Sequence, residues 1–68
     1  MNRPVRALDQ GTSDPLLTVR ELAELLQRTP EAIYQMRYQG TAPRAVKVGR
    51  SLRFKHSVVE AWLVSLSE

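Results

Sequence analysis

Hydrophobic residues recur with helical spacing early in the chain, with strand-like spacing near its middle, and with helical spacing again at its end. In the first of these segments, Thr18 and Glu21 form the S/T-x-x-E pattern of a capping box, which predicts that a helix begins there. The hydrophobic residues that follow share one helical face at i, i+3, i+4 and i+7: Val19, Leu22, Ala23 and Leu26.

A second helix is predicted over residues 30–39. Thr29 suits the N-cap position, Pro30 the first helical turn, and Gly40 the left-handed position that ends a helix. Only about three residues separate this helix from the first, which is the pattern of a helix-turn-helix. Ile33 and Met36 are expected to point inward. The residues expected to point outward are Glu31, Tyr34, Gln35 and Tyr38.

Alternation with a period of two predicts a β-hairpin over residues 46–55. Its strands flank a loop of three residues, Gly49-Arg50-Ser51. With this loop, the hydrophobic side chains of both strands face the helices. The side chains then left facing outward are Lys47, Arg53 and Lys55.

The last segment predicts a third helix, which begins at a second capping-box pattern, Ser57 to Glu60. Its expected inner face carries Val59, Trp62, Leu63 and Leu66, with Trp62 as the main anchor of the core. Val58, Ala61 and Val64 lie beside or opposite that face. They are either ordinary exposed residues or the border of a contact with a partner protein.

These elements predict a monomeric, mainly α-helical winged helix-turn-helix with three helices and a two-stranded wing. The expected domain occupies residues 15–68, and residues 1–14 are expected to form a flexible arm because they lack a sustained period. The arm is either inert or contacts a phosphate backbone through Arg3 and Arg6.

The charge of the chain is concentrated in one segment. The net charge of the 68 residues is only +3, and the sequence pI is about 10.0. Residues 41–55 contain no acidic residue, whereas they carry these basic residues: Arg44, Lys47, Arg50, Arg53 and Lys55. A solvated surface normally mixes both signs of charge, so the segment indicates an anionic partner more readily than a merely solvated face.

Composition argues against catalysis and against cofactor or metal binding. The chain has no cysteine, and its single histidine, His56, cannot build a multi-histidine site. No glycine-rich phosphate loop or catalytic constellation is present. We also find no apolar run long enough for a membrane span and no signal-peptide pattern, so the expected location is the cytoplasm.

The predicted second helix and wing together indicate binding to double-stranded DNA, because a helix-turn-helix places its second helix in the major groove. Gln35 is the first choice for base recognition, since its amide pairs with two atoms of adenine. Glu31 is either a cytosine acceptor or simply a favourable charge at the helix N-terminus. The remaining candidates on this helix are Thr29, Tyr34, Arg37 and Tyr38. In the wing, Arg50 is expected in a minor groove. The other wing candidates are Arg44, Lys47, Ser51, Arg53 and Lys55.

Several of these segments occur in the same order in a known family. They are Leu16–Leu26 (LLTVRELAELL), residues 29–34 (TPEAIY), residues 46–54 (VKVGRSLRF) and residues 59–63 (VEAWL). Over residues 16–66 the chain resembles the excisionase family of MerR-like winged-helix DNA-binding domains. The resemblance places Glu31, Tyr34 and Gln35 on the recognition helix, and Arg50 and Arg53 in the wing.

The resemblance implies a small protein of a phage or mobile element in a bacterial host. Such a recombination directionality factor binds and bends attachment-site DNA, assists a separate integrase in excision, and catalyses nothing itself. Some members bind repeated sites as head-to-tail rows. Two alternatives remain open at this point: a small MerR-like transcriptional regulator and a protein-interaction module.

Overall fold

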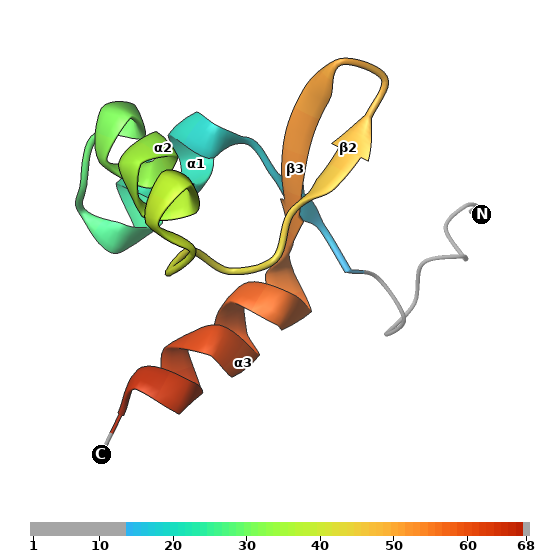
Figure 1. Cartoon of the computed structure of the whole chain (residues 1–68). Helices are drawn as coiled ribbons and strands as arrows, with labels where there is room; N and C mark the ends of the chain where they lie inside the picture. The colour runs from blue at the N-terminus through green and yellow to red at the C-terminus, as the bar shows by residue number, and fades with distance from the viewer. Residues whose placement is uncertain (1–13, 68) are drawn as a thin grey trace, which may run out of the picture.

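The computed structural model describes residues 14–67, which form three helices and a small antiparallel sheet (Figure 1). In chain order the elements are β1 (Leu16–Leu17), α1 (Val19–Leu26), α2 (Pro30–Gln39), β2 (Val46–Val48), β3 (Ser51–Lys55) and α3 (His56–Leu66). This arrangement confirms the predicted winged helix-turn-helix. The predicted arm, except for Asp14, lies outside the described residues.

The helix-turn-helix pair is organised by local capping. At the start of α1, the Thr18 Oγ1 accepts a hydrogen bond from the Glu21 N–H at 3.0 Å, and the Glu21 carboxylate accepts one from the Thr18 N–H at 2.9 Å. Helix α1 ends at Gln27, which adopts the left-handed conformation (φ 58°) that glycine more often takes. Thr29 then caps α2 by accepting from the Ala32 N–H at 3.1 Å.

The core lies where α1 packs against both α2 and β3, and where α3 meets β3. Its largest fully buried side chains are Phe54, Leu22, Ile33 and Val59. Phe54 comes from β3, so the aromatic anchor of the core is supplied by the wing strand rather than by the last helix. A domain this small has few core positions, and one aromatic ring at the centre fills much of the available volume.

The wing hairpin has a tighter turn than the sequence indicated. Val48 pairs directly with Ser51, so the connection contains two residues, Gly49 and Arg50, and not three. Gly49 has φ 64°, as the first turn residue of a two-residue type II′ hairpin requires. The predicted register is therefore wrong by one residue, and a shift of one residue reverses the faces of the paired strands relative to each other.

The observed register mixes charged and hydrophobic side chains on each face of the wing. Lys47 pairs with Leu52 and therefore lies on the face that packs toward the helices. Arg53 pairs with Val46 on the other face. Lys47 therefore shares the face of Leu52 and not that of Arg53, although its side chain is exposed as expected, and Val48 is 52% exposed as well.

The sheet has a third strand that the pattern did not predict. Leu16 and Leu17 of β1 pair antiparallel with Lys55 and Phe54 of β3, giving the strand order β1-β3-β2. A strand of two residues is too short to show a period in the sequence. It covers the second edge of β3 and leads directly into α1 (Figure 1).

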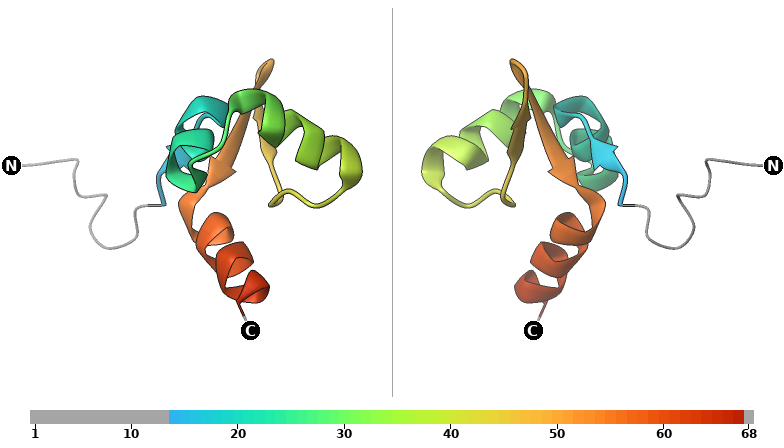
Figure 2. Two further views of the ribbon diagram at one scale, coloured as in Figure 1. Left: turned by 90° about the vertical axis from the view of Figure 1, so that its left-hand side faces the viewer. Right: turned by 90° about the vertical axis from the view of Figure 1, so that its right-hand side faces the viewer.

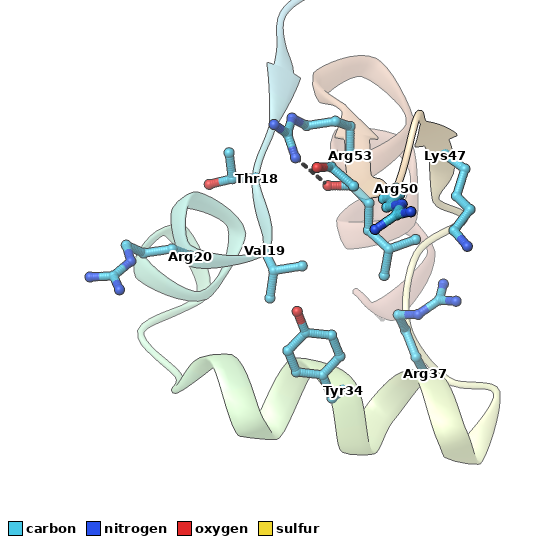
Figure 3. Close-up of a pocket in the computed structure, with 10 residues that line it drawn as sticks. Thr18, Val19, Arg20, Tyr34, Arg37, Lys47, Arg50 and Arg53 are labelled. Carbon is cyan, nitrogen blue, oxygen red and sulfur yellow. Dashed lines mark hydrogen bonds between the residues drawn. The ribbon is translucent and has the colours of Figure 1, made fainter.

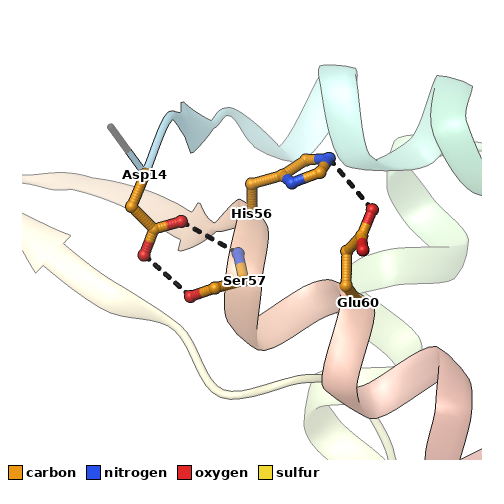
Figure 4. Close-up of polar contacts among 4 residues, drawn as sticks. All are labelled: Asp14, His56, Ser57 and Glu60. Carbon is orange, nitrogen blue, oxygen red and sulfur yellow. Dashed lines mark hydrogen bonds and ion pairs between the residues drawn. The ribbon is translucent and has the colours of Figure 1, made fainter. Parts of the chain in front are cut away.

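Helix α3 does not begin with the predicted capping box. The helix starts at His56, so Ser57 already lies in its first turn, and Glu60 pairs with His56 at 3.5 Å. Asp14 caps the helix instead: its carboxylate accepts hydrogen bonds from the Ser57 N–H at 2.9 Å and the Ser57 Oγ at 2.7 Å (Figure 4). The Pro15 carbonyl also accepts from the His56 N–H at 2.9 Å. We call these three hydrogen bonds the Asp14 clasp.

The clasp changes the titration of Asp14. The hydrogen bond from the Ser57 backbone N–H, followed by that from the Ser57 hydroxyl, holds the pKa of the Asp14 carboxyl below its usual value of 3.8. Both bonds favour the ionised form because a carboxylate accepts hydrogen bonds more strongly than a carboxylic acid does. The clasp is therefore strongest when Asp14 is charged.

Trp62 is not the core anchor that the sequence indicated. Helix α3 extends away from the helix-turn-helix pair, so its first turn contributes Val59 to the core while its later turns leave it (Figure 2). Trp62 is half-buried, and its indole Nε1 donates to the Thr41 carbonyl at 3.1 Å. Leu63 and Leu66, also predicted to be inside, are 37% and 57% exposed.

Candidate nucleic-acid interface

A hollow of about 570 Å³ separates the helix-turn-helix from the wing. We call it the wing cleft. It is lined by Thr18, Val19, Arg20, Tyr34, Arg37, Lys47, Arg50, Ser51, Leu52 and Arg53 (Figure 3). These residues come from α1, α2 and the wing, so the cleft exists only when all three are packed together.

The wing cleft concentrates positive charge. Its basic side chains come from every element that borders it: Arg20, Arg37, Lys47, Arg50 and Arg53. No acidic residue lines the cleft, and the one acidic and basic pair of side chains within ion-pair distance in residues 14–67 is Glu60 and His56, on α3. The positive charges of the cleft are thus not neutralised by ion pairs in the described part of the chain, which favours an anionic partner.

The flank of α2 nearest the wing contributes Tyr34 and Arg37. They are three residues apart, and side chains with this spacing lie on neighbouring positions of one helical face. Tyr34 directs its hydroxyl into the cleft, and Arg37 extends from the helix toward Lys47 (Figure 3). Two of the predicted recognition-helix residues therefore belong to the same site as the wing.

The other predicted residues of α2 lie outside the wing cleft. Glu31, Gln35 and Tyr38 are exposed, and Tyr38 reaches 89% exposure. Ile33 is fully buried and fixes the orientation of the helix, so these side chains occupy its outer surface. Thr29 is also exposed, but its hydroxyl oxygen is used in the N-cap of α2.

The basic segment of residues 41–55 is divided by the fold. Lys47, Arg50 and Arg53 line the cleft, and Ser51 lies among them. Arg53 lies on the face of β3 opposite to that of Leu52, although its side chain also lines the cleft. Its Nη1 donates a hydrogen bond to the Leu52 carbonyl at 2.8 Å. The other two basic residues are not part of the cleft: Arg44 borders a separate hollow beside Arg37, and Lys55 precedes α3.

Arg20 lines the cleft but was not among the predicted DNA-binding residues. Arg20 is not part of the hydrophobic face of α1, and it is exposed. Nothing in the helical pattern shows that the wing folds next to the first turn of α1. A basic residue within the capping box that begins a helix-turn-helix is the only local signal, and it is a weak one.

The predicted protein-contact residues lie on α3, away from the wing cleft. Val64 is 71% exposed and Ala61 is exposed, while Val58 is half-buried. Among residues 14–67, no group of His, Cys, Asp and Glu side chains could hold a metal ion. None of the helices in this described range is long and apolar enough to cross a membrane.

Residues 16–66 match the family model of a helix-turn-helix domain. The chain belongs to this family. A search among curated proteins finds no match to the chain. The matched residues of this helix-turn-helix domain include both helices of the pair, the wing and all of α3, so they contain the complete wing cleft. Family membership indicates double-stranded DNA as the partner, because the motif is a DNA-binding motif.

Proposed function

We propose that this domain binds double-stranded DNA with α2 in the major groove and the wing on the neighbouring backbone, and that it acts as an excisionase-type architectural protein. The observation that carries the proposal is the wing cleft, where basic side chains from three elements meet without an acidic residue. Contacts between such a cleft and DNA phosphates fix the position of a helix-turn-helix on the duplex. The exposed side chains of α2 then read base edges.

The resemblance to excisionases supports the finer part of the proposal. In this role the domain catalyses nothing itself. It bends the attachment-site DNA of a phage or mobile element in a bacterial host and assists an integrase, with further copies on adjacent sites. Arg50, exposed at the turn of the wing, is suited to a minor groove, where guanidinium groups respond to groove width.

Salt dependence of DNA binding tests the role of the cleft. If its five cations meet phosphates, log K falls with log salt at a slope of about −4.5, since each neutralised phosphate contributes about −0.9. Fluorescence anisotropy on selected duplexes across a salt series measures this slope. Arg28→Gln is the control, because Arg28 lies outside the cleft, and it keeps the wild-type slope. Binding that does not change with salt contradicts the proposal.

Gln35→Ala tests base recognition by α2. Gln35 is exposed on the outer surface of the helix, so the variant should fold normally. We expect it to lose about 1–3 kcal/mol of discrimination at one base position. Competition binding between the selected site and its single-base variants measures this loss. An equal loss of affinity for selected and random DNA removes Gln35 from base recognition.

An excision assay separates the excisionase from its alternatives. The purified protein is added to an integrase and to DNA carrying the attachment sites of the same mobile element. Stimulated excision supports the proposal, whereas site-specific binding without stimulation supports a transcriptional regulator. Absence of binding to genomic fragments at low salt favours a protein-interaction module that uses Val58, Ala61 and Val64.

A further inference from the structure

Two basic side chains from different elements converge inside the wing cleft. Arg37 extends from α2 toward the wing, and the Lys47 side chain extends from β2 toward α2 (Figure 3). Both residues are exposed, and neither forms an ion pair within residues 14–67. Like charges that approach one another repel, and an anion placed between them reverses the sign of the interaction.

The remaining basic side chains of the cleft are placed differently. Arg20 projects away from Lys47 and Arg37, on the far side of the first turn of α1 (Figure 3). Arg53 uses one of its guanidinium nitrogens on the Leu52 carbonyl at 2.8 Å. Arg50 sits in the hairpin turn. Arg37 and Lys47 are therefore the pair that spans the junction between the recognition helix and the wing.

The walls of the cleft favour binding of a phosphate group at this junction. Tyr34 directs its hydroxyl, a hydrogen-bond donor, into the same cleft on the side of Val19 (Figure 3). Val19 and the half-buried Leu52 add apolar side chains to the lining of the cleft. A phosphodiester supplies one negative charge and two free oxygens to such donors.

We propose that Arg37 and Lys47 hold one and the same DNA phosphate between them, with the Tyr34 hydroxyl as a further donor, and that this phosphate seat sets the position of α2 in the major groove. The inference rests on the proposed DNA binding. It assigns the main contact with the DNA backbone to the junction of α2 and β2 instead of the tip of the wing. Phosphate contacts fix the register of a protein on the duplex, so the seat determines which bases α2 reaches.

Replacement of single phosphates by uncharged methylphosphonates tests the seat. The probe is a set of short synthetic duplexes that carry the site selected by the protein from random-sequence DNA, each with one phosphate replaced. With the wild-type protein, we expect one replacement to weaken binding by at least about tenfold, because it removes contacts with two cations and a single charge-assisted contact already accounts for about tenfold. The same scan is then made with Arg37→Gln, Lys47→Gln and, as control, Arg28→Gln.

The seat predicts that Arg37→Gln and Lys47→Gln weaken binding to unmodified DNA and reduce the effect of replacement at the same phosphate. It also predicts that Arg28→Gln keeps the wild-type pattern, because Arg28 lies outside the cleft. The inference is overturned if Arg37→Gln and Lys47→Gln lose their sensitivity to methylphosphonate replacement at two different phosphates. It is also overturned if either variant keeps the wild-type pattern of sensitivity. Circular dichroism melting shows that the variants are folded. Absence of wild-type binding contradicts the proposed function itself, whereas binding without a sensitive phosphate contradicts only the seat.

Discussion

Helices α1 and α3 begin with the same sequence pattern but are held in place differently. Thr18 and Glu21 complete a reciprocal capping box at the start of α1, across a separation of three residues. At the start of α3, the equivalent Ser57 bonds instead to Asp14, which is 43 residues away in the chain. One helix is capped by its own residues, and the other by the segment that precedes β1 (Figure 4).

The two helices also differ in how much of their hydrophobic face they bury. Helix α1 buries Val19, Leu22 and Ala23, whereas α3 buries only Val59 and leaves Leu63 and Leu66 exposed. Helix α1 is packed between α2 and β3, while α3 is attached mainly through its first turn. The difference teaches that a hydrophobic helical stripe shows which face prefers burial, but not whether the fold supplies a surface to cover it.

The largest expected effect comes from removing a core side chain of α1. Leu22 is fully buried, so Leu22→Ala should lower the free energy of unfolding by about 2–5 kcal/mol through lost transfer energy and a new cavity. The matched change on α3, Leu66→Ala, should stay within about 0.5 kcal/mol because Leu66 is 57% exposed. Urea unfolding measures both. Equal losses would show that the later turns of α3 are packed in solution, which the fold does not predict.

A smaller effect is expected from the two caps. Thr18→Ala removes the side-chain acceptor of the capping box and should cost about 1 kcal/mol. Ser57→Ala should cost less, because the backbone N–H of residue 57 keeps its bond to the Asp14 carboxylate. Thermal unfolding followed by circular dichroism compares the two variants. A larger loss for Ser57→Ala than for Thr18→Ala would mean that the hydroxyl bond dominates the clasp.

The smallest effect should be a pH-dependent one at the Asp14 clasp. The folded state lowers the pKa of Asp14 below 3.8, so its contribution is present above that value and is lost as the pH falls through the lower folded pKa. Asp14→Asn should therefore melt below the wild type at neutral pH, and the two should converge in acid below pH 3.8. Glu24→Gln, which removes an exposed carboxylate of α1, is the control for general loss of charge. A difference that persists unchanged in acid contradicts the clasp.

The wing shows why a correctly predicted element can carry an incorrectly predicted register. The alternation of residues 46–55 predicted the hairpin, and the structure confirms it. The turn, however, closes with Gly49 and Arg50 alone, so Lys47 moves to the face of Leu52 and enters the wing cleft. Loop lengths of two and three residues are both common in hairpins, and the sequence pattern here did not distinguish them.

The site was predictable where its residues lie on one helix. The helical period correctly gave the outward positions of Tyr34, Gln35 and Tyr38, because a single buried residue, Ile33, fixes the orientation of α2. It was not predictable that Arg37, Lys47 and Arg20 line the same cleft. Their common position in the lining of the cleft depends on how the wing packs beside the helix pair, which no spacing along the chain encodes.

The sequence by itself determined the three helices, the hairpin, the capping of α1 and α2, and the concentration of positive charge in residues 41–55. These features depend on interactions between residues a few positions apart, so a local pattern is sufficient to predict them. Only the tertiary structure decided that Phe54 and not Trp62 is the core anchor, that Asp14 caps α3, and that Arg37 and Lys47 share one cleft. Each of these depends on which distant segments come into contact, and that choice is made by the packing of the whole domain.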